Sequence, residues 1–225
     1  QMDCEWAAQG FVFNQRERNA SILRGITVTR APGGNGGGLL AQCASPSIVD
    51  CAFVSNSAQF GGGVHVQSGA EPFFYNCEIR ANSSDYHGSG LYAMHPSRLR
   101  MERCRILRNT YGGLDLSGAT EAFLRRCLVA ENTTKGDTAG GIYASYLARL
   151  NVDECTLVGN KGSAYGGAIG CNTMSSRVLV RNSIVWGNTP GAFYSGSITA
   201  TYSTVQGGWA GAGNMSSNPC LRLDG

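Results

Sequence analysis

Three charged residues stand at the same place in successive segments of this sequence and have the types that acid–base chemistry uses. They are Glu102, Arg125 and Asp153. Two carboxyl groups can serve as general acid and general base, and a guanidinium can neutralise a carboxylate of a substrate. Because the signs of the charges alternate along the series, pairing of neighbouring charges across adjacent strands is the preferred interpretation, and catalysis is the alternative.

A second set of residues combines aromatic rings with histidine and aspartate. Its members are His65, Tyr86, His87, Tyr92, Tyr111, Asp115, Tyr143 and Tyr165. Aromatic rings on a flat strip can stack on sugar rings, and a histidine, a tyrosine and an aspartate within reach of one another can move protons. The set predicts a carbohydrate-binding surface, with catalysis as a lesser alternative. Tyrosine is also a favourable strand residue, so a purely structural role is the simplest alternative.

Both sets are carried by a repeat with a cysteine, an apolar residue two places later and an asparagine five places after the cysteine. The cysteines are Cys51, Cys77, Cys104, Cys127 and Cys155, and the asparagines are Asn56, Asn82, Asn109, Asn132, Asn160 and Asn188. The asparagines are 26, 27, 23, 28 and 28 residues apart, and Ser183 replaces the cysteine in the last copy. A repeat of this length with no helical pattern inside it indicates a solenoid.

Three short segments in each repeat alternate apolar and polar residues with a period of two, as residues 72–76, 77–80 and 90–93 do. This pattern predicts an all-β fold, a parallel β-helix of about seven coils with three strands per coil and a length of roughly 34 Å at ~4.8 Å per rung. In the third strand Ala168 is expected to face inward. The outward row is then Leu40, His65, Tyr92, Asp115, Tyr143 and Ile169. In each repeat a segment joins the asparagine to the glycine that precedes the third strand. The segment between Asn109 and Gly113 is the shortest of these, and it predicts a depression in the surface over Asp115.

The repeated asparagines and cysteines predict two internal ladders. Asparagine at a sharp turn tolerates a left-handed backbone, and its amide can bond to the next coil. The sequons at Asn82 and Asn132 would then be buried, leaving those at Asn19 and Asn214 open. The stacked cysteines are interpreted as small buried apolar residues, with disulfides between rungs as an alternative. A Cys171–Cys220 disulfide near the last coils is a further hypothesis, and zinc is disfavoured because a linear ladder does not make a tetrahedron.

Length and composition fit one domain spanning 1–225, with a partial coil at 1–31, regular coils at 32–188 and an irregular cap at 189–225. The net charge is only +3 and the arginines are spread through the repeats, which disfavours nucleic-acid binding. No apolar run approaches the roughly 20 residues of a membrane helix, so no membrane insertion is expected. No cofactor is expected, with Ca²⁺ at Asp85 and Asp137 as an alternative.

The chain opens at Gln1 in what reads as the middle of a repeat, and no signal peptide is visible. We interpret the sequence as a processed product or as part of a longer chain.

Several short segments of the sequence resemble those of a known protein family. They are Gly36-Gly-Gly-Leu39, Cys43-Ala-Ser-Pro-Ser-Ile-Val-Asp-Cys51, Ser183-Ile-Val-Trp-Gly-Asn188 and Tyr202-Ser-Thr-Val-Gln-Gly-Gly-Trp209. They resemble the bacterial right-handed parallel β-helix repeat proteins, which share the pectin-lyase-like fold. Phe53-Val-Ser-Asn56 and Gly166-Gly-Ala-Ile169 are also similar to repeats of chlamydial-type polymorphic outer-membrane proteins. The resemblance implies a right-handed coil. In the enzymes of this fold, the strand before the cysteine carries the cleft, which places Glu102, Arg125 and Asp153 there.

The same coil carries enzymes and adhesins, so the fold leaves the function open. We expect an extracellular or cell-surface module that is not an enzyme and that binds a polysaccharide or cell-surface glycan, or acts as an adhesin or structural spacer. The first alternative is a polysaccharide lyase or glycoside hydrolase acting on an acidic polysaccharide. The second is a structural subunit that associates with other subunits end to end or laterally.

Overall fold

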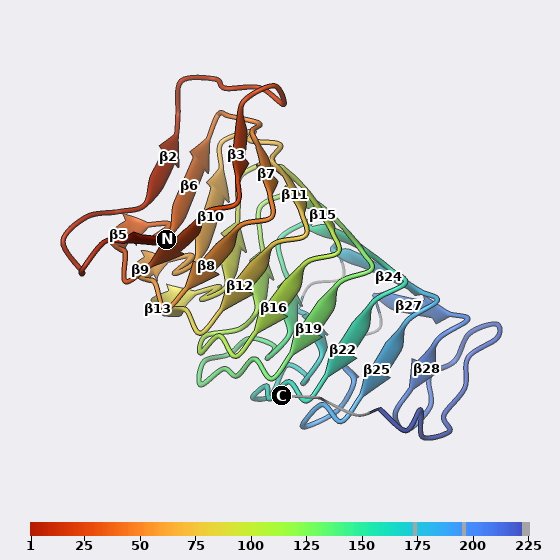
Figure 1. Cartoon of the computed structure of the whole chain (residues 1–225). Helices are drawn as coiled ribbons and strands as arrows, with labels where there is room; N and C mark the ends of the chain where they lie inside the picture. The colour runs from red at the N-terminus through yellow and green to blue at the C-terminus, as the bar shows by residue number, and fades with distance from the viewer. Residues whose placement is uncertain (173–174, 195–196, 222–225) are drawn as a thin grey trace.

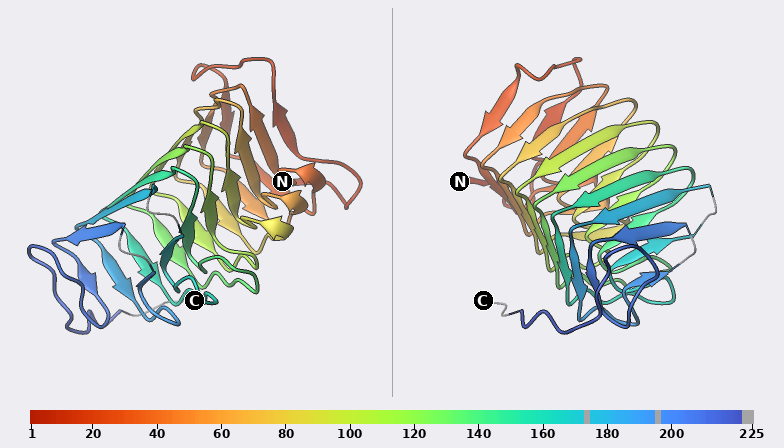
Figure 2. Two further views of the ribbon diagram at one scale, coloured as in Figure 1. Left: turned by 180° about the vertical axis from the view of Figure 1, so that it is seen from behind. Right: turned by 90° about the vertical axis from the view of Figure 1, so that its right-hand side faces the viewer.

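The computed structural model describes residues 1–172, 175–194 and 197–221 as a solenoid of parallel strands (Figure 1). The chain visits three long sheets in turn on each coil and completes about seven turns. Within each sheet, strands of successive coils pair with one another, and the first and last strands pair on one side only; Figure 2 shows the stack from two further sides. The predicted all-β coil of three strands is confirmed. No helix long and apolar enough to cross a bilayer occurs in the part of the chain that is described.

The four sheets are named A to D. Sheet A contains β1 (Met2–Asp3), β4 (Thr27–Thr29), β8 (Ala52–Val54), β12 (Glu78–Arg80), β16 (Arg105–Leu107), β19 (Leu128–Ala130), β22 (Thr156–Val158), β25 (Ile184–Trp186) and β28 (Thr204–Val205). Sheet B contains β2 (Phe11–Phe13), β6 (Leu39–Gln42), β10 (Val64–Gln67), β14 (Leu91–Ala93), β17 (Leu114–Leu116), β20 (Ile142–Ala144), β23 (Ile169–Cys171) and β26 (Phe193–Tyr194).

Sheet C contains β3 (Ile22–Arg24), β7 (Ser47–Val49), β11 (Phe73–Tyr75), β15 (Arg98–Glu102), β18 (Glu121–Arg125), β21 (Arg149–Asp153), β24 (Arg177–Arg181) and β27 (Ile198–Thr201). Sheet D is short and contains β5 (Pro32–Asn35), β9 (Ser57–Phe60) and β13 (Ser83–His87). The strands of sheet D lie between those of sheet A and sheet B along the chain, in the segments that follow β4, β8 and β12.

The core is built from apolar residues that repeat in register. Ile79 of sheet A, Leu91 of sheet B and Met101 of sheet C are almost fully buried in one continuous cluster. Parallel sheets hide one face in this way because each strand is hydrogen-bonded on both sides along the solenoid. One expected register is wrong: Ile169, not Ala168, pairs with Ile142, so both residues are buried and Gly170 takes the outward place.

The asparagine ladder is present and its amides are fully used. The Oδ1 atom of Asn109 accepts hydrogen bonds from the backbone N of Asn82 at 3.0 Å and from its Nδ2 at 3.1 Å. The Nδ2 atom of Asn109 donates to the Ile79 carbonyl at 3.1 Å and to Oδ1 of Asn132 at 2.9 Å. Asn82 and Asn132 are therefore buried as predicted and cannot carry glycans. The predicted left-handed backbone belongs to the preceding residue, such as Ala81 with φ of 53°, because the amide itself must point inward.

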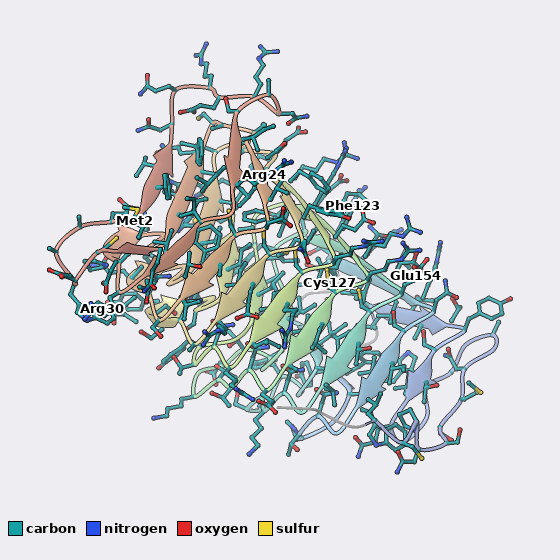
Figure 3. All side chains as sticks on the ribbon, viewed as in Figure 1. Met2, Arg24, Arg30, Phe123, Cys127 and Glu154 are labelled. Atoms are coloured by element: carbon teal, nitrogen blue, oxygen red, sulfur yellow. The ribbon has the colours of Figure 1, made fainter. Side chains whose placement is uncertain are left out.

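The cysteine ladder is buried in the core as the sequence predicts, and its thiols also form hydrogen bonds. The thiol of Cys77 donates to the carbonyls of Ile48 and Tyr75, both at 3.3 Å. Ser183 fits the same place because its hydroxyl donates to the Arg181 carbonyl at 2.6 Å and accepts from the backbone N of Cys155 at 3.1 Å. A short side chain with a donor is what this turn requires. Figure 3 labels Cys127, another member of the ladder, between the strands.

The proposed Cys171–Cys220 disulfide is not formed. Cys171 is buried in sheet B, whereas Cys220 is an exposed free thiol. The five ladder cysteines are also thiols, so no disulfide links the rungs among the described residues.

At its C-terminal end the solenoid is closed by a segment that folds back on the last coil. Regular pairing continues past the predicted boundary at 188, since Thr204 and Val205 pair with Ile184 and Val185. Ala200 and Val205 still supply core contacts, and this keeps the last coil in register. Beyond them the chain folds back, and Asn214 accepts a hydrogen bond from the backbone N of Ser203 at 3.0 Å. Its Nδ2 donates to the Ala200 carbonyl at 2.9 Å, so the sequon there is not an open site either.

Replacing Asn109 with alanine should lower the free energy of unfolding by about 3 kcal/mol or more. The change leaves several buried backbone and amide groups of neighbouring coils without partners, and each such group costs about 1–3 kcal/mol. Urea denaturation followed by circular dichroism measures the loss. Asn151→Ala on the outer face of sheet C is the matched control and should change stability by less than about 0.5 kcal/mol. Equal losses in the two variants would contradict a dominant role for the ladder.

Candidate functional site

The charged series on sheet C is in the expected register but does not form one site. Glu102, Arg125 and Asp153 stand on adjacent strands and pair rung to rung. The guanidinium of Arg125, however, contacts Glu154 at 3.2 Å. The Asp153 carboxylate accepts a hydrogen bond from Asn182 at 2.9 Å. Arg125 and Asp153 thus have partners in the neighbouring turns rather than each other.

The surroundings of this series are open. A depression of about 230 Å³ borders Asp153, Arg181 and Asn182 and includes neither Glu102 nor Arg125. Figure 3 places Phe123 and Glu154 along the outer edge of the solenoid on the same side. The exposed ion pairs of this face, such as Glu121 with Arg98 at 3.6 Å and with Arg149 at 3.8 Å, contribute little to stability.

The outward row of sheet B is covered, which corrects the expectation of a flat exposed strip. His65, Tyr92, Asp115 and Tyr143 occupy successive rungs. Their exposed fractions are only 1%, 8%, 4% and 6%. Sheet D and the segments between the asparagines and sheet B lie over them. This cover could not be read from strand periodicity, which says only that these side chains point away from the core.

Four rings are grouped on the side of the row nearest the first coils. Phe60 stacks on Tyr86 at a centroid distance of 5.3 Å and on Tyr92 at 5.8 Å. The His87 ring also stacks on Tyr92 at 5.8 Å. Tyr86 is itself exposed at the surface. These contacts bring the end of β13 against sheet B and place His87 beside Asp115.

Asp115 is a buried carboxylate with one charged neighbour. Its Oδ2 atom lies 3.0 Å from Nδ1 of His87, a contact that is an ion pair when the imidazole is protonated. Burial raises the pKa of the Asp115 carboxyl, and His87 opposes that shift. Asp115 in turn raises the pKa of His87 against the effect of partial burial. Burial and then the Asp115 charge raise the pKa of Tyr92 to about 12.

A cavity of about 210 Å³ opens over Asp115. It lies where the segment from Asn109 to Gly113 is too short to cover the row, as the loop lengths indicate. Tyr92 lines one side and Tyr143 the other. Its lining also includes His87, Ser117, Asp137, Thr138, Ser145, Tyr146 and Asn172.

The structure brings only half of the second predicted set to this cavity. His87, Tyr92, Asp115 and Tyr143 line it. The other four do not. Tyr165 packs edge-on against Tyr143 at 5.9 Å, and the backbone N of Tyr111 bonds to the Ser89 hydroxyl at 2.7 Å. Tyr86 belongs to the ring group described above. His65 is buried next to Tyr92, away from the opening.

Sequence reasoning missed five residues of the cavity lining, namely Ser117, Thr138, Ser145, Tyr146 and Asn172. Ser117 and Ser145 follow Asp115 and Tyr143 by two residues, so the period of a strand carried to its end would have found them. Tyr146 is exposed and has a left-handed backbone, with φ of 49°, which no repeat position predicts.

No group of three or more His, Cys, Asp or Glu residues within the described ranges comes together as a metal site. Asp85 is exposed on β13, and Asp137 lies at the cavity. The Ca²⁺ alternative gathers no set of carboxylates from the described residues.

Comparison with protein families adds one finding. The family model described as the right handed beta helix region matches residues 10–185, well over half of the chain. The chain belongs to the right-handed β-helix family. The match spans the coils that carry both ladders and the cavity, and it supports the expected handedness of the coil. A comparison with curated proteins finds no match. The family assignment fixes the β-helix scaffold and leaves its chemistry to be argued from the site.

His65 should make this β-helix sensitive to acid. Both of its ring nitrogens are buried without a hydrogen-bond partner, and burial lowers its pKa from 6.5 to about 4. The unfolded chain therefore binds a proton below pH 6.5 that the folded chain takes up only near pH 4. Stability falls as the pH drops through this window, by roughly 3 kcal/mol at most.

His65→Leu, which copies Leu40 on the preceding rung, should remove most of this slope. Urea denaturation at pH 7.5, 5.5 and 4.5 measures it. The control His95→Asn alters an exposed turn histidine and should keep most of the wild-type slope, because burial lowers the pKa of His65 more than the charge of His95 does. An unchanged slope in His65→Leu would show that other groups control the acid response.

Proposed function

We propose that this β-helix is a carbohydrate-binding module of an extracellular or cell-surface protein, and that it binds a single sugar residue of a glycan in the cavity over Asp115. The observation that carries the proposal is a buried carboxylate placed between Tyr92 and Tyr143 at the bottom of an open cavity. A buried carboxylate with unused acceptor capacity can take hydrogen bonds from sugar hydroxyls, and flanking rings can cover the apolar face of a sugar.

The size and polarity of the cavity support this ligand class. Its volume of about 210 Å³ lies below the roughly 300–1,000 Å³ of pockets that enclose drug-sized molecules. One sugar residue of a longer chain fits that scale. The hydroxyl groups of Ser117 and Ser145 add polar partners at its edge. The rest of a glycan would lie outside, over the surface of the solenoid.

The proposed location outside the cell is supported by the resemblance to surface β-helix proteins and is compatible with the thiols. Seven of the nine cysteines are buried, which shields them from external oxidants. The rigid stack of coils also suits a spacer that holds the cavity away from a surface.

Glycoside hydrolysis is the second candidate, and one observation favours it. Asp115 and Asp137 line the same cavity in different environments, the first buried and the second exposed. Two carboxyl groups held in different surroundings can divide the roles of acid and base. Release of reducing ends from a panel of polysaccharides would support this candidate, and release of unsaturated products would support a lyase.

Asp115→Asn and Tyr143→Ala should each weaken glycan binding by about tenfold or more. Losing a charge-assisted hydrogen bond or a ring contact costs about 1.5 kcal/mol, and 1.4 kcal/mol is tenfold in affinity. A glycan array identifies the ligand, and isothermal titration calorimetry measures the affinity. Tyr143 is part of the sheet B row, so the folding of each variant is checked by circular dichroism.

The matched controls are Asp153→Asn and Phe123→Ala on the outer face of sheet C, and both should bind as wild type. Binding lost in Asp153→Asn but kept in Asp115→Asn would move the site to sheet C and contradict the proposal.

A further inference from the structure

The cavity over Asp115 is unusual in its charge. The chain has 18 basic residues against 15 acidic ones. Yet among the described residues that line the cavity there are two aspartates, Asp115 and Asp137, and no lysine or arginine. Among the described residues, His87 is the group beside the Asp115 carboxylate that carries a positive charge when it is protonated. The cavity is thus a local acidic site on a weakly basic protein.

The walls of the cavity also suit a cation. Three tyrosines line it, namely Tyr92, Tyr143 and Tyr146. The face of an aromatic ring carries partial negative charge and attracts ammonium groups, by about 0.5–2 kcal/mol depending on solvent exposure. Tyr92 and Tyr143 are almost fully buried, so their contacts with a bound cation would be little screened by water.

His87 leaves room for a second cation at Asp115. Its side chain is 45% exposed, while that of Asp115 is 6% exposed. When it is protonated, the imidazole is the counter-ion of the carboxylate. A ligand ammonium that reaches Asp115 can take over this role, because the exposed imidazole can then give up its proton to solvent.

We propose that the sugar residue bound over Asp115 is an amino sugar with a free amino group. Its ammonium pairs with the Asp115 carboxylate, and its ring lies between Tyr92 and Tyr143. The hydroxyl groups of Ser117 and Ser145, which line the cavity, form hydrogen bonds with the remaining polar groups of the sugar. This assignment rests on the proposed carbohydrate-binding function and narrows it to glycans that contain unsubstituted amino sugars.

An N-acetyl group would remove the charge and enlarge the substituent at the same position. A neutral hexose would leave the buried carboxylate with hydroxyl donors only. Hydrogen bonds to charged groups contribute about 1.5–3 kcal/mol, against about 0.5–1.5 kcal/mol for neutral pairs. The unsubstituted amino sugar should therefore bind at least about tenfold more tightly than either analogue.

The test compares ligands on the unaltered protein. Isothermal titration calorimetry at pH 7 is carried out with glucosamine, N-acetylglucosamine, glucose and ethanolamine, and with the corresponding short β-1,4-linked oligomers of the three sugars. Glucosamine and its oligomer should bind at least tenfold more tightly than the other sugars and than ethanolamine. Asp115→Asn should abolish this preference, while Asp153→Asn, on sheet C, should keep it.

The outcomes separate this inference from the proposed function. Equal binding of glucose and glucosamine at the cavity would overturn the amino-sugar assignment and leave carbohydrate binding in place. Ethanolamine binding as tightly as glucosamine would show that the sugar ring is not recognised, which also overturns the assignment. Binding of none of the sugars would contradict both. A preference for glucosamine that survives in Asp115→Asn would place the cation elsewhere and overturn the role of Asp115.

Discussion

The buried amide of the asparagine ladder is the interaction on which the rest of this solenoid depends. Each Asn side chain joins its own turn to the coils on both sides, because its Oδ1 accepts from the preceding asparagine and its Nδ2 donates in two directions. A buried amide left without partners would cost several kcal/mol. Every coil must therefore make this turn with the same backbone geometry, so that the asparagines stack on one another, whatever residues the coil carries elsewhere.

This constraint also fixes what lies next to the ladder. The glycine that opens each sheet B strand packs against the amide, and a Cβ on Gly90 would lie 2.9 Å from Nδ2 of Asn109 and 2.3 Å from the Gly113 carbonyl. The chain between asparagine and glycine is free of this constraint, and it varies in length. Beside its shortest copy a cavity opens over the buried Asp115, whereas longer copies cover His65 and pack rings around Tyr92 and Tyr143. A structural repeat with one short segment thus leaves a cavity on this covered row.

The chemistry of that cavity follows from its position between two aromatic groups. Phe60 and His87 pack on Tyr92, and Tyr165 packs on Tyr143, so the rings on both sides are held by neighbours rather than left to move. A carboxylate held between them loses most of its water, and its charge then acts strongly on whatever enters the cavity. On sheet C, Arg125 is exposed and pairs with Glu154, and Glu102 and Asp153 are half-buried. Water screens the charges of this face more strongly than it screens the buried carboxylate of Asp115.

The sequence by itself determined the three-strand coil, the two ladders and the inward stripes, because these depend on the strand period of two and on the spacing of Cys77, Asn82 and their copies. It also indicated the dip over Asp115, since segment length is visible in the sequence. Only the tertiary structure decided that the row from His65 to Tyr143 is covered, and that Ile169 replaces Ala168 in register. It alone showed that His87 reaches Asp115 while Glu102 and Asp153 stay apart. These features depend on how segments of irregular conformation fold over a neighbouring sheet, and no repeat or periodicity specifies that path.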